Sequence, residues 1–172
     1  MIEVTASHIK RDLPGFPDEV IETWIMPLAE DAGWPPVIFS RWDRILMHRP
    51  LTFWRALEWE KRRVPLSSLL IEPDSLRRIQ GLIDANVNGV NNVFAQQISD
   101  TGDRFRGILR YIHQHERLPV PPVLLQVGLQ YAVLDGDHRL AAYFHAGPSA
   151  LGPTCWVGLA TTGGKKRCQE PF

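Results

Sequence analysis

The C-terminal half of the chain alternates between helical and strand-like patterns of apolar residues. Phe105, Ile108 and Ile112 recur three or four residues apart, which is the spacing of one helix face, and predict a helix over residues 102–115. Shorter apolar runs, the first two separated by Gly128, predict a hairpin and a further strand. These strands are expected over residues 123–127, 129–134 and 154–160. Between the hairpin and the last strand, residues 137–145 should form a helix that Gly147 ends.

The N-terminal part is predicted to be helical. Val20, Trp24 and Leu28 recur at helical spacing, so we expect a helix over residues 17–31, with Pro17 in its first turn. Pro27 should kink or split this helix, and the Gly-Trp-Pro-Pro sequence at 33–36 should end it. Two shorter helices are expected over residues 40–47 and 51–57.

A strand and a helix are predicted between these two parts. Residues 59–70 have the pattern of a strand, in which Pro65 indicates a sheet edge or the strand's end. Residues 75–84 should form a helix with Ile79 and Leu82 on one face and Asp74 as its cap. Residues 86–99 are rich in Asn and Gln and are expected to form a loop or a short irregular helix.

The length of 172 residues allows one core and is too short for two ordinary domains with a linker. We therefore expect a helical N-terminal extension, residues 1–57, packed on a core domain, residues 58–160. Residues 161–172 have no apolar face and are predicted to be a mobile tail. The element order predicts an α+β fold, a small mixed sheet with flanking helices.

Five of the six tryptophans fall in the first third of the chain: Trp24, Trp34, Trp42, Trp54 and Trp59. One interpretation is that they pack the N-terminal helices onto the core. The alternative is a surface that binds a protein partner or stacks on bases. Nothing in their spacing favours exposure.

Charge and apolar content restrict the classes of partner. Lys and Arg together number 19, as do Asp and Glu, so the chain lacks the excess positive charge that drives non-specific binding to nucleic acid. A nucleic-acid partner is therefore not favoured by charge. No apolar run approaches the roughly 20 residues that span a bilayer, and residues 1–12 lack the features of a signal peptide. These observations predict a cytoplasmic protein without membrane contact. Cys155, within an apolar stretch, should be a buried small hydrophobe.

Candidate chemistry is concentrated in the sequence Asp135-Gly136-Asp137-His138-Arg139, where a predicted strand meets a predicted helix. The unpaired N–H groups and the dipole of a helix N-terminus attract anions, and Gly136 permits close approach of a phosphate. Arg139 could place its planar fork against phosphate oxygens. Asp135 could hold a divalent metal or accept a proton. The alternative is ordinary turn chemistry, with Asp137 as a helix cap.

The sequence from Leu118 to Ala142 resembles the ParB and sulfiredoxin superfamily. It combines Leu-Pro-x-Pro-Pro, a predicted hairpin, and Val-Leu-Asp-Gly-Asp-His-Arg-Leu-Ala-Ala. The resemblance covers about 60 residues, 101–160, and extends weakly back to the strand near 63–70. It implies a ParB/sulfiredoxin-like fold for the core domain and a ParB-like nucleotide-binding or nuclease function.

The resemblance also implies roles for individual residues. Partitioning members cradle the phosphates of CTP with Gly-Glu-Arg-Arg, so Gly136 and Arg139 inherit phosphate binding, and His138 stands where the first arginine would be. Sulfiredoxins carry a reactive cysteine where this chain has Asp137, which argues against sulfinic acid reduction. ParB-like small-molecule kinases carry Asp-Gly-His-His-Arg, the most similar string, which implies Asp135 and His138 near a nucleotide and its magnesium.

The resemblance implies a phosphotransferase or nucleotide hydrolase that uses Mg²⁺ with CTP or ATP, with Asp135, Asp137 and His138 as catalytic candidates. Gly136, His138 and Arg139 are the candidates for nucleotide binding, and Asp135 for the metal. Glu72 is the candidate for a further catalytic carboxylate upstream. The alternative is a non-catalytic, nucleotide-gated binding or regulatory module. Nuclease or DNA-associated activity is disfavoured by the absence of a basic face and a dense carboxylate cluster in the sequence.

Overall fold

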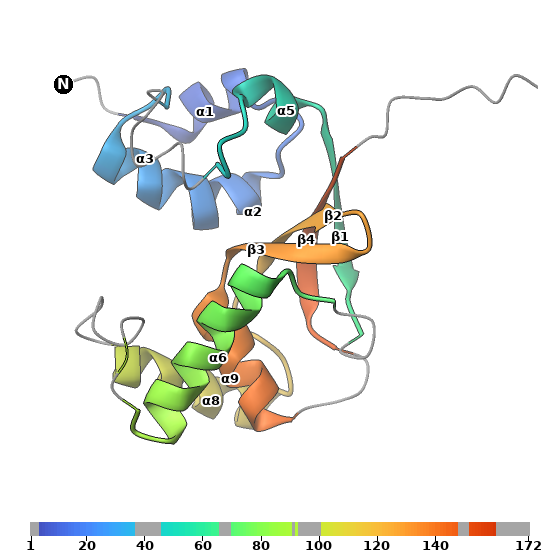
Figure 1. Cartoon of the computed structure of the whole chain (residues 1–172). Coiled ribbons are helices and arrows are strands. Elements are labelled where there is room, and N and C mark those ends of the chain that lie inside the picture. The colour runs from blue at the N-terminus through green and yellow to red at the C-terminus, as the bar shows by residue number, and fades with distance from the viewer. Residues whose placement is uncertain are drawn as a thin grey trace, which may run out of the picture.

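The computed structural model describes residues 4–36, 46–65, 70–90, 92, 101–147 and 152–160. These residues form three layers, with a four-stranded sheet between two groups of helices (Figure 1). The N-terminal group comprises α1 (Ala6–Asp12), α2 (Asp18–Val20), the π-helical turn η1 (Ile21–Ile25), α3 (Met26–Ala32) and α5 (Leu51–Arg55). The other group comprises α6 (Pro73–Val87), α8 (Thr101–His115) and α9 (Asp137–Ala146).

The sheet has the order β1-β4-β2-β3. Its strands are β1 (Leu57–Arg63), β2 (Val123–Val127), β3 (Gln130–Asp135) and β4 (Thr154–Ala160). β1 pairs with β4 and β2 pairs with β3 in antiparallel fashion, whereas β2 and β4 run parallel. The predicted α+β fold with a small mixed sheet and flanking helices is therefore confirmed.

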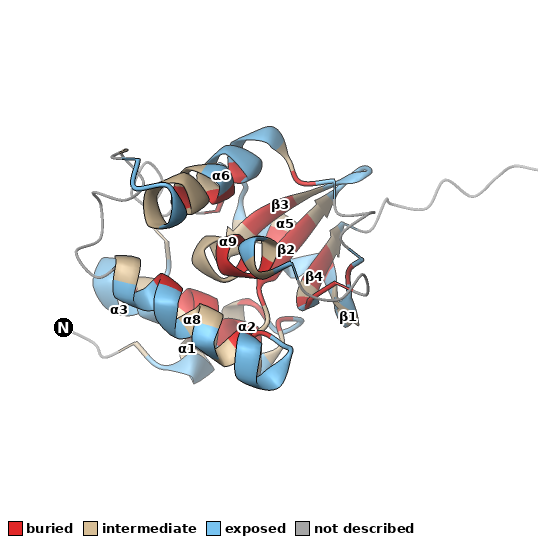
Figure 2. Cartoon of the chain, turned by 90° about the horizontal axis from the view of Figure 1, so that it is seen from below, coloured by how far each residue is buried: buried red, intermediate tan, exposed pale blue. Residues whose placement is uncertain are grey.

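Alternating side chains of the strands enter two separate cores. Leu124 of β2 and Val133 of β3 pack with α6, α8 and α9, whereas their neighbours Leu125 and Ala132 pack with the N-terminal helices. Both faces of β2 and β3 are thus covered, which is why these strands contain mostly apolar residues. Figure 2 shows buried residues along β2 and in the middle of β3, and exposed residues on the outward sides of α6 and α8.

The predicted N-terminal helix is present, and its irregularity lies next to Pro27. In η1 the Met26 N–H bonds to the carbonyl of Ile21, five residues back, just ahead of the proline. Gly33, with φ of 84°, ends α3. The helix α1 was not predicted, because seven residues with one buried position, Ile9, make too short a pattern. Its cap, Thr5, accepts a hydrogen bond from the His8 N–H and was the available signal.

The tryptophans confirm the packing interpretation where they are described. Trp24 and Trp54 are 3% and 0% exposed, and Trp34 and Trp59 pack partly buried against the same core. Trp42 lies outside the described residues. A protein partner for these helices stays a prediction. Among the described helices, none is both long enough and apolar enough to cross a membrane.

Most of the other predicted helices and strands are present. The hairpin with its turn at Gly128, the strand 154–160 and the helices 51–57, 102–115 and 137–145 are confirmed, with small shifts of their ends. The strand predicted over residues 59–70 is β1, which lies at the sheet edge and spans Leu57–Arg63, so Val64 and Pro65 were wrongly included in it. Cys155 is fully buried, and burial raises the pKa of its thiol to about 12.

One cap was predicted wrongly, and several predictions concern residues outside the described part. The cap of α6 is Glu72 and not Asp74, and the helix extends to Val87, so residues 86 and 87 are helical. Leu46, Met47 and His48 form a turn, whereas the rest of the predicted helix 40–47 lies outside the described residues. Residues 66–69, most of residues 88–99 and the predicted tail 161–172 also lie outside the described residues.

Candidate functional site

The predicted site lies at a cavity where β3 ends and α9 begins. This α9 cavity has a volume of about 480 Å³. It is lined by Arg78 and Leu82 of α6, Arg104 and Ile108 of α8, Pro119 ahead of β2, and residues 134–139. All five residues of the Asp-Gly-Asp-His-Arg sequence therefore line one cavity. Residues of α6 and α8 together with Pro119 form the rest of its lining.

The turn between β3 and α9 requires glycine. Gly136 has φ of 105° and ψ of 23°, a left-handed conformation that other residues adopt only with strain. A Cβ atom there would lie 3.0 Å from Cβ of Pro122 and 3.2 Å from Nε of Arg139. The Gly136 carbonyl accepts the first hydrogen bond of α9, from the Leu140 N–H at 2.9 Å. The glycine therefore both reverses the chain and starts the helix.

The N-terminus of α9 opens at this cavity. Gly136 occupies the cap position, and no side chain of the described residues caps the helix. Asp137 is the first residue of α9 and turns its carboxylate toward Arg78 instead of capping. The N–H groups of the first turn and the positive end of the helix dipole thus contribute to the attraction of an anion.

Arg139 connects three segments of the chain. Its Nη1 donates to the carbonyls of Val120 at 3.2 Å and Pro121 at 3.1 Å, and its Nη2 forms an ion pair with Asp135. Its side chain is 14% exposed. The guanidinium therefore joins the end of β3 and the start of α9 to the segment that leads into β2, while it also lines the cavity.

Asp137 is held by an arginine that the sequence did not single out. Nε of Arg78 donates to Oδ2 of Asp137 at 2.9 Å, and Nη2 of Arg78 donates to the Val133 carbonyl at 3.1 Å. Burial raises the pKa of Asp137 above its ordinary value, and Arg78 opposes this effect. The carboxyl thus binds its proton more tightly than a solvated aspartate, as suits a group that exchanges protons.

Glu72 serves α6 and does not line the cavity. Its carboxylate accepts from the N–H groups of Asp74 at 2.9 Å and Ser75 at 3.0 Å. The buried Ser75 hydroxyl donates to Glu72 and accepts from the Val133 N–H and from Arg78. This chain of contacts fixes the start of α6 to β3 and orients Arg78 toward Asp137.

The charges of the lining favour an anion. Arg78, Arg104 and Arg139 contribute three positive charges, and Asp135 and Asp137 contribute two negative ones. The net charge is one positive, to which the helix N-terminus adds. Among the described residues, no group of three or more His, Cys, Asp or Glu side chains could hold a metal ion. The two carboxylates fit a divalent cation only where phosphate oxygens complete its coordination.

Arg78, Ser75 and Arg104 were not among the candidate residues predicted from the sequence. Arg78 stands between Ser75 and Ile79, both of which face inward, and this position beside the apolar stripe was the available signal. Its partner Asp137 lies 59 residues further along the chain. Local periodicity carries no information on such a pair.

Comparisons of the chain with models of protein families, with curated proteins and with solved structures find no match.

Proposed function

We propose that this chain binds a nucleotide or another small phosphorylated molecule in the α9 cavity, with the phosphates at the N-terminus of α9. The observation that carries the proposal is the arrangement of the lining, which joins that N-terminus to Arg78 of α6 and Arg104 of α8. Helix N–H groups and guanidinium forks are the groups that proteins use to bind phosphate. A volume of about 480 Å³ lies within the range of small-molecule sites.

A ParB/sulfiredoxin-like fold is part of the proposal. In its support, α8 leads through a proline-containing segment to the hairpin β2–β3, the turn at Gly136 and α9. This order agrees with the order of elements in that superfamily. The contacts around Gly136 and Arg139 also agree with a turn that positions a phosphate-binding helix.

The catalytic form of the proposal is a phosphotransferase or nucleotide hydrolase. Asp137, whose pKa is raised, would accept the proton of an attacking hydroxyl or water as the terminal phosphoryl group leaves the nucleoside diphosphate. Arg78 and Arg104 would neutralise the phosphates, and His138 lies beside Asp137 in the same lining. A Mg²⁺ ion that enters with CTP or ATP would be held by Asp135 together with phosphate oxygens and would offset their charge.

The alternative, binding without turnover, is favoured by one observation. Asp135 forms an ion pair with Arg139, and Asp137 forms one with Arg78. A carboxylate that stays paired is a poor base and a poor metal ligand. If the pairs persist with nucleotide bound, the site is a nucleotide-gated module whose conformation a partner reads.

The test is calorimetric titration of the purified chain with CTP, ATP and their diphosphates in the presence of magnesium. Arg104→Ala removes one cation from the lining on the exposed side of α8. Arg106→Ala, on the same helix and outside the cavity, is the matched control for loss of charge. We expect Arg104→Ala to weaken binding roughly ten-fold, about 1.4 kcal/mol, and Arg106→Ala to leave it unchanged.

An Arg139→Ala variant, first shown to be folded, should also lose affinity, because Arg139 positions the segment beside the phosphates. Analysis of the nucleotide products then separates an enzyme from a switch. Absence of binding by every nucleotide, or equal losses in Arg104→Ala and Arg106→Ala, would contradict the proposal.

A further inference from the structure

A second, larger cavity lies at the same end of the sheet. Arg63, the last residue of β1, pairs with Thr154, the first residue of β4, and Asp135 at the end of β3 pairs with Val123 at the start of β2. Because β2 and β4 are parallel, these strand ends lie together. The second cavity, here called the Tyr143 cavity, has a volume of about 650 Å³ and lies beside Arg63 and Thr154.

One short segment separates the two cavities. Pro119 lines both, and Pro121 lines the Tyr143 cavity. Arg139, which lines the α9 cavity, holds this segment through the carbonyls of Val120 and Pro121. The wall between the cavities is thus fixed from one side by Arg139, a residue of the first cavity.

Some charged residues that line the Tyr143 cavity form ion pairs with each other and others do not. Lys61 forms an ion pair with Glu19 at 2.6 Å, and Glu19 also accepts from the Trp156 indole at 3.0 Å. The remaining charges are the cations Arg63 and Arg117 and the single acid Glu116. Within the described part of the chain, neither arginine forms an ion pair. The lining therefore has an excess of one positive charge and two guanidinium groups able to receive an anion.

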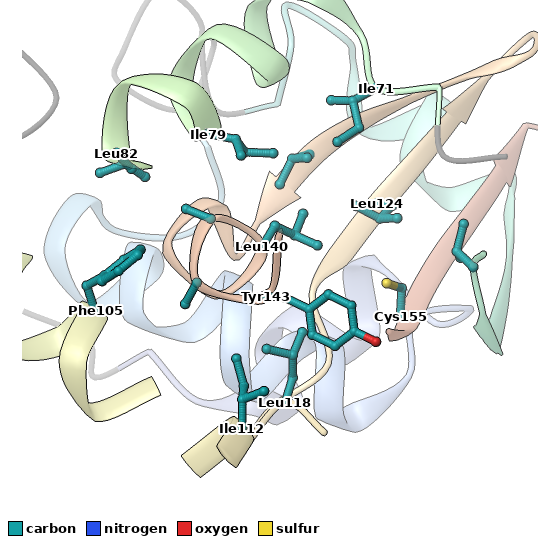
Figure 3. Packing of buried hydrophobic residues seen from close by; sticks show 14 of the residues in the cluster. Ile71, Ile79, Leu82, Phe105, Ile112, Leu118, Leu124, Leu140, Tyr143 and Cys155 are labelled. Carbon is teal, nitrogen blue, oxygen red and sulfur yellow. The ribbon is translucent and has the colours of Figure 1, made fainter. Parts of the chain in front are cut away.

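Tyr143 adds a buried polar group to this lining. The residue is 2% exposed, and Figure 3 shows its ring beside Leu118 and Cys155 in the core. None of the hydrogen bonds among the described residues uses its hydroxyl. Burial raises the pKa of this phenol and the charge of Arg63 lowers it, so the hydroxyl lies within the field of that arginine. At neutral pH it is an O–H donor beside a cation.

We propose that the Tyr143 cavity is a second binding site, for a small organic molecule with a carboxylate or phosphate group. Arg63 and Arg117 bind the anionic group, the Tyr143 hydroxyl donates a hydrogen bond to it, and Leu118 with the prolines contacts the apolar body. The site does not depend on nucleotide binding in the α9 cavity, since its cations Arg63 and Arg117 do not line that cavity.

The test uses three probes with the same ring: phenyl phosphate, benzoate and the neutral benzyl alcohol. Each is titrated into the isotope-labelled full chain at constant ionic strength, and amide and tyrosine resonances are followed. We expect saturable shifts at Tyr143, Gly152 and Thr154 with at least one of the two anions and much weaker binding of the alcohol. The anion that binds more tightly identifies the ligand as a phosphate ester or a carboxylate.

Four variants locate the binding. Arg63→Ala and Arg117→Ala, both at exposed positions, should each lower the affinity for the anion roughly ten-fold. Tyr143→Phe keeps the ring in the core and should lower this affinity to a smaller extent. Arg110→Ala removes the same charge from α8 outside both cavities and should leave affinity unchanged. The proposal is overturned if neither anion saturates, if the alcohol binds equally well, or if the shifts lie at residues 137–139 and disappear in Arg104→Ala.

Discussion

Arg78 of α6 and Asp137 of α9 form a two-pronged ion pair, with Nε–Oδ2 and Nη2–Oδ1 distances of 2.9 and 3.5 Å. The pair joins two helices that pack against each other on the same face of the sheet. Both residues line the α9 cavity. The same guanidinium bonds to the Val133 carbonyl, so helix, strand and helix meet at one side chain. The site and the stability of the second helical layer therefore depend on the same residue.

Replacement of Arg78 should destabilise the fold. Arg78→Met leaves Asp137 and the Val133 carbonyl without their donor, and we expect the free energy of unfolding to fall by about 1–3 kcal/mol. The pair is about one third exposed, which keeps the loss below that of a fully buried pair. Urea denaturation measures the change.

Arg77→Met is the matched control. Arg77 forms an exposed ion pair with Asp74, so its replacement should cost about 0.5 kcal/mol or less. If both variants lose the same stability, Arg78 has no special structural role. In a double-mutant cycle, Asp137→Asn should cost less in the Arg78→Met background than in the wild type.

Ionisation of Asp137 should oppose folding. Burial raises its pKa above the ordinary value of 3.8, although Arg78 opposes the shift. Since the folded pKa is the higher one, the contribution of Asp137 to stability is complete below 3.8 and is lost as pH rises through the folded value. The stability of the wild type relative to Asp137→Asn should therefore decrease as pH rises across this range. An increase would mean that Arg78 outweighs burial.

Glu72 should stabilise α6 in a pH-dependent manner opposite to that of Asp137. Burial acts to raise its pKa, but hydrogen bonds from the Asp74 and Ser75 N–H groups, helped by Arg78, lower it below the ordinary 4.5. The stabilisation is thus present above 4.5 and lost as pH falls through the folded value. Glu72→Ala should cost about 1 kcal/mol at neutral pH and less in acid. Thermal denaturation at both pH values tests this.

Asp74→Ala is the control for the cap. Asp74 is exposed and lies in the first turn without capping it, so its loss should cost only about 0.3–1 kcal/mol, from the helix dipole and an exposed pair. A larger loss of stability for Asp74→Ala than for Glu72→Ala would indicate that Asp74, the residue predicted from the sequence, is the cap of α6.

Alanine at Gly136 should be unfavourable. The positive φ alone costs a non-glycine residue about 1–3 kcal/mol, and the new Cβ would crowd Pro122 and Arg139. Gly107→Ala, in the middle of α8 with nothing within 4 Å of its Cβ, should instead stabilise the chain by about 0.5–1 kcal/mol. Opposite signs of the two changes in chemical denaturation are expected. A neutral Gly136→Ala would show that the turn can relax.

Elements with strong local signals were predictable from the sequence. The hairpin at Gly128, the strand 154–160 and the helix that Gly147 ends were correct because periodicity and glycine conformation act within a few residues. The cap of α6 was not, since Glu72 and Asp74 are both plausible acceptors. Only the backbone hydrogen bonds that hold Leu70 and Glu72 beside Tyr131 of β3 decide which of the two meets the first N–H groups of α6.

The sequence by itself determined that Asp135, Gly136, Asp137, His138 and Arg139 would gather at the start of a helix, because neighbours along a tight turn cannot separate. The tertiary structure alone decided what surrounds them. It brought Arg78 to Asp137 and aimed Arg139 at the carbonyls of 120 and 121, and it placed Arg63 near Tyr143. These contacts depend on the strand order β1-β4-β2-β3, which results from packing both faces of the sheet. The local periodicity of the sequence does not reveal this order.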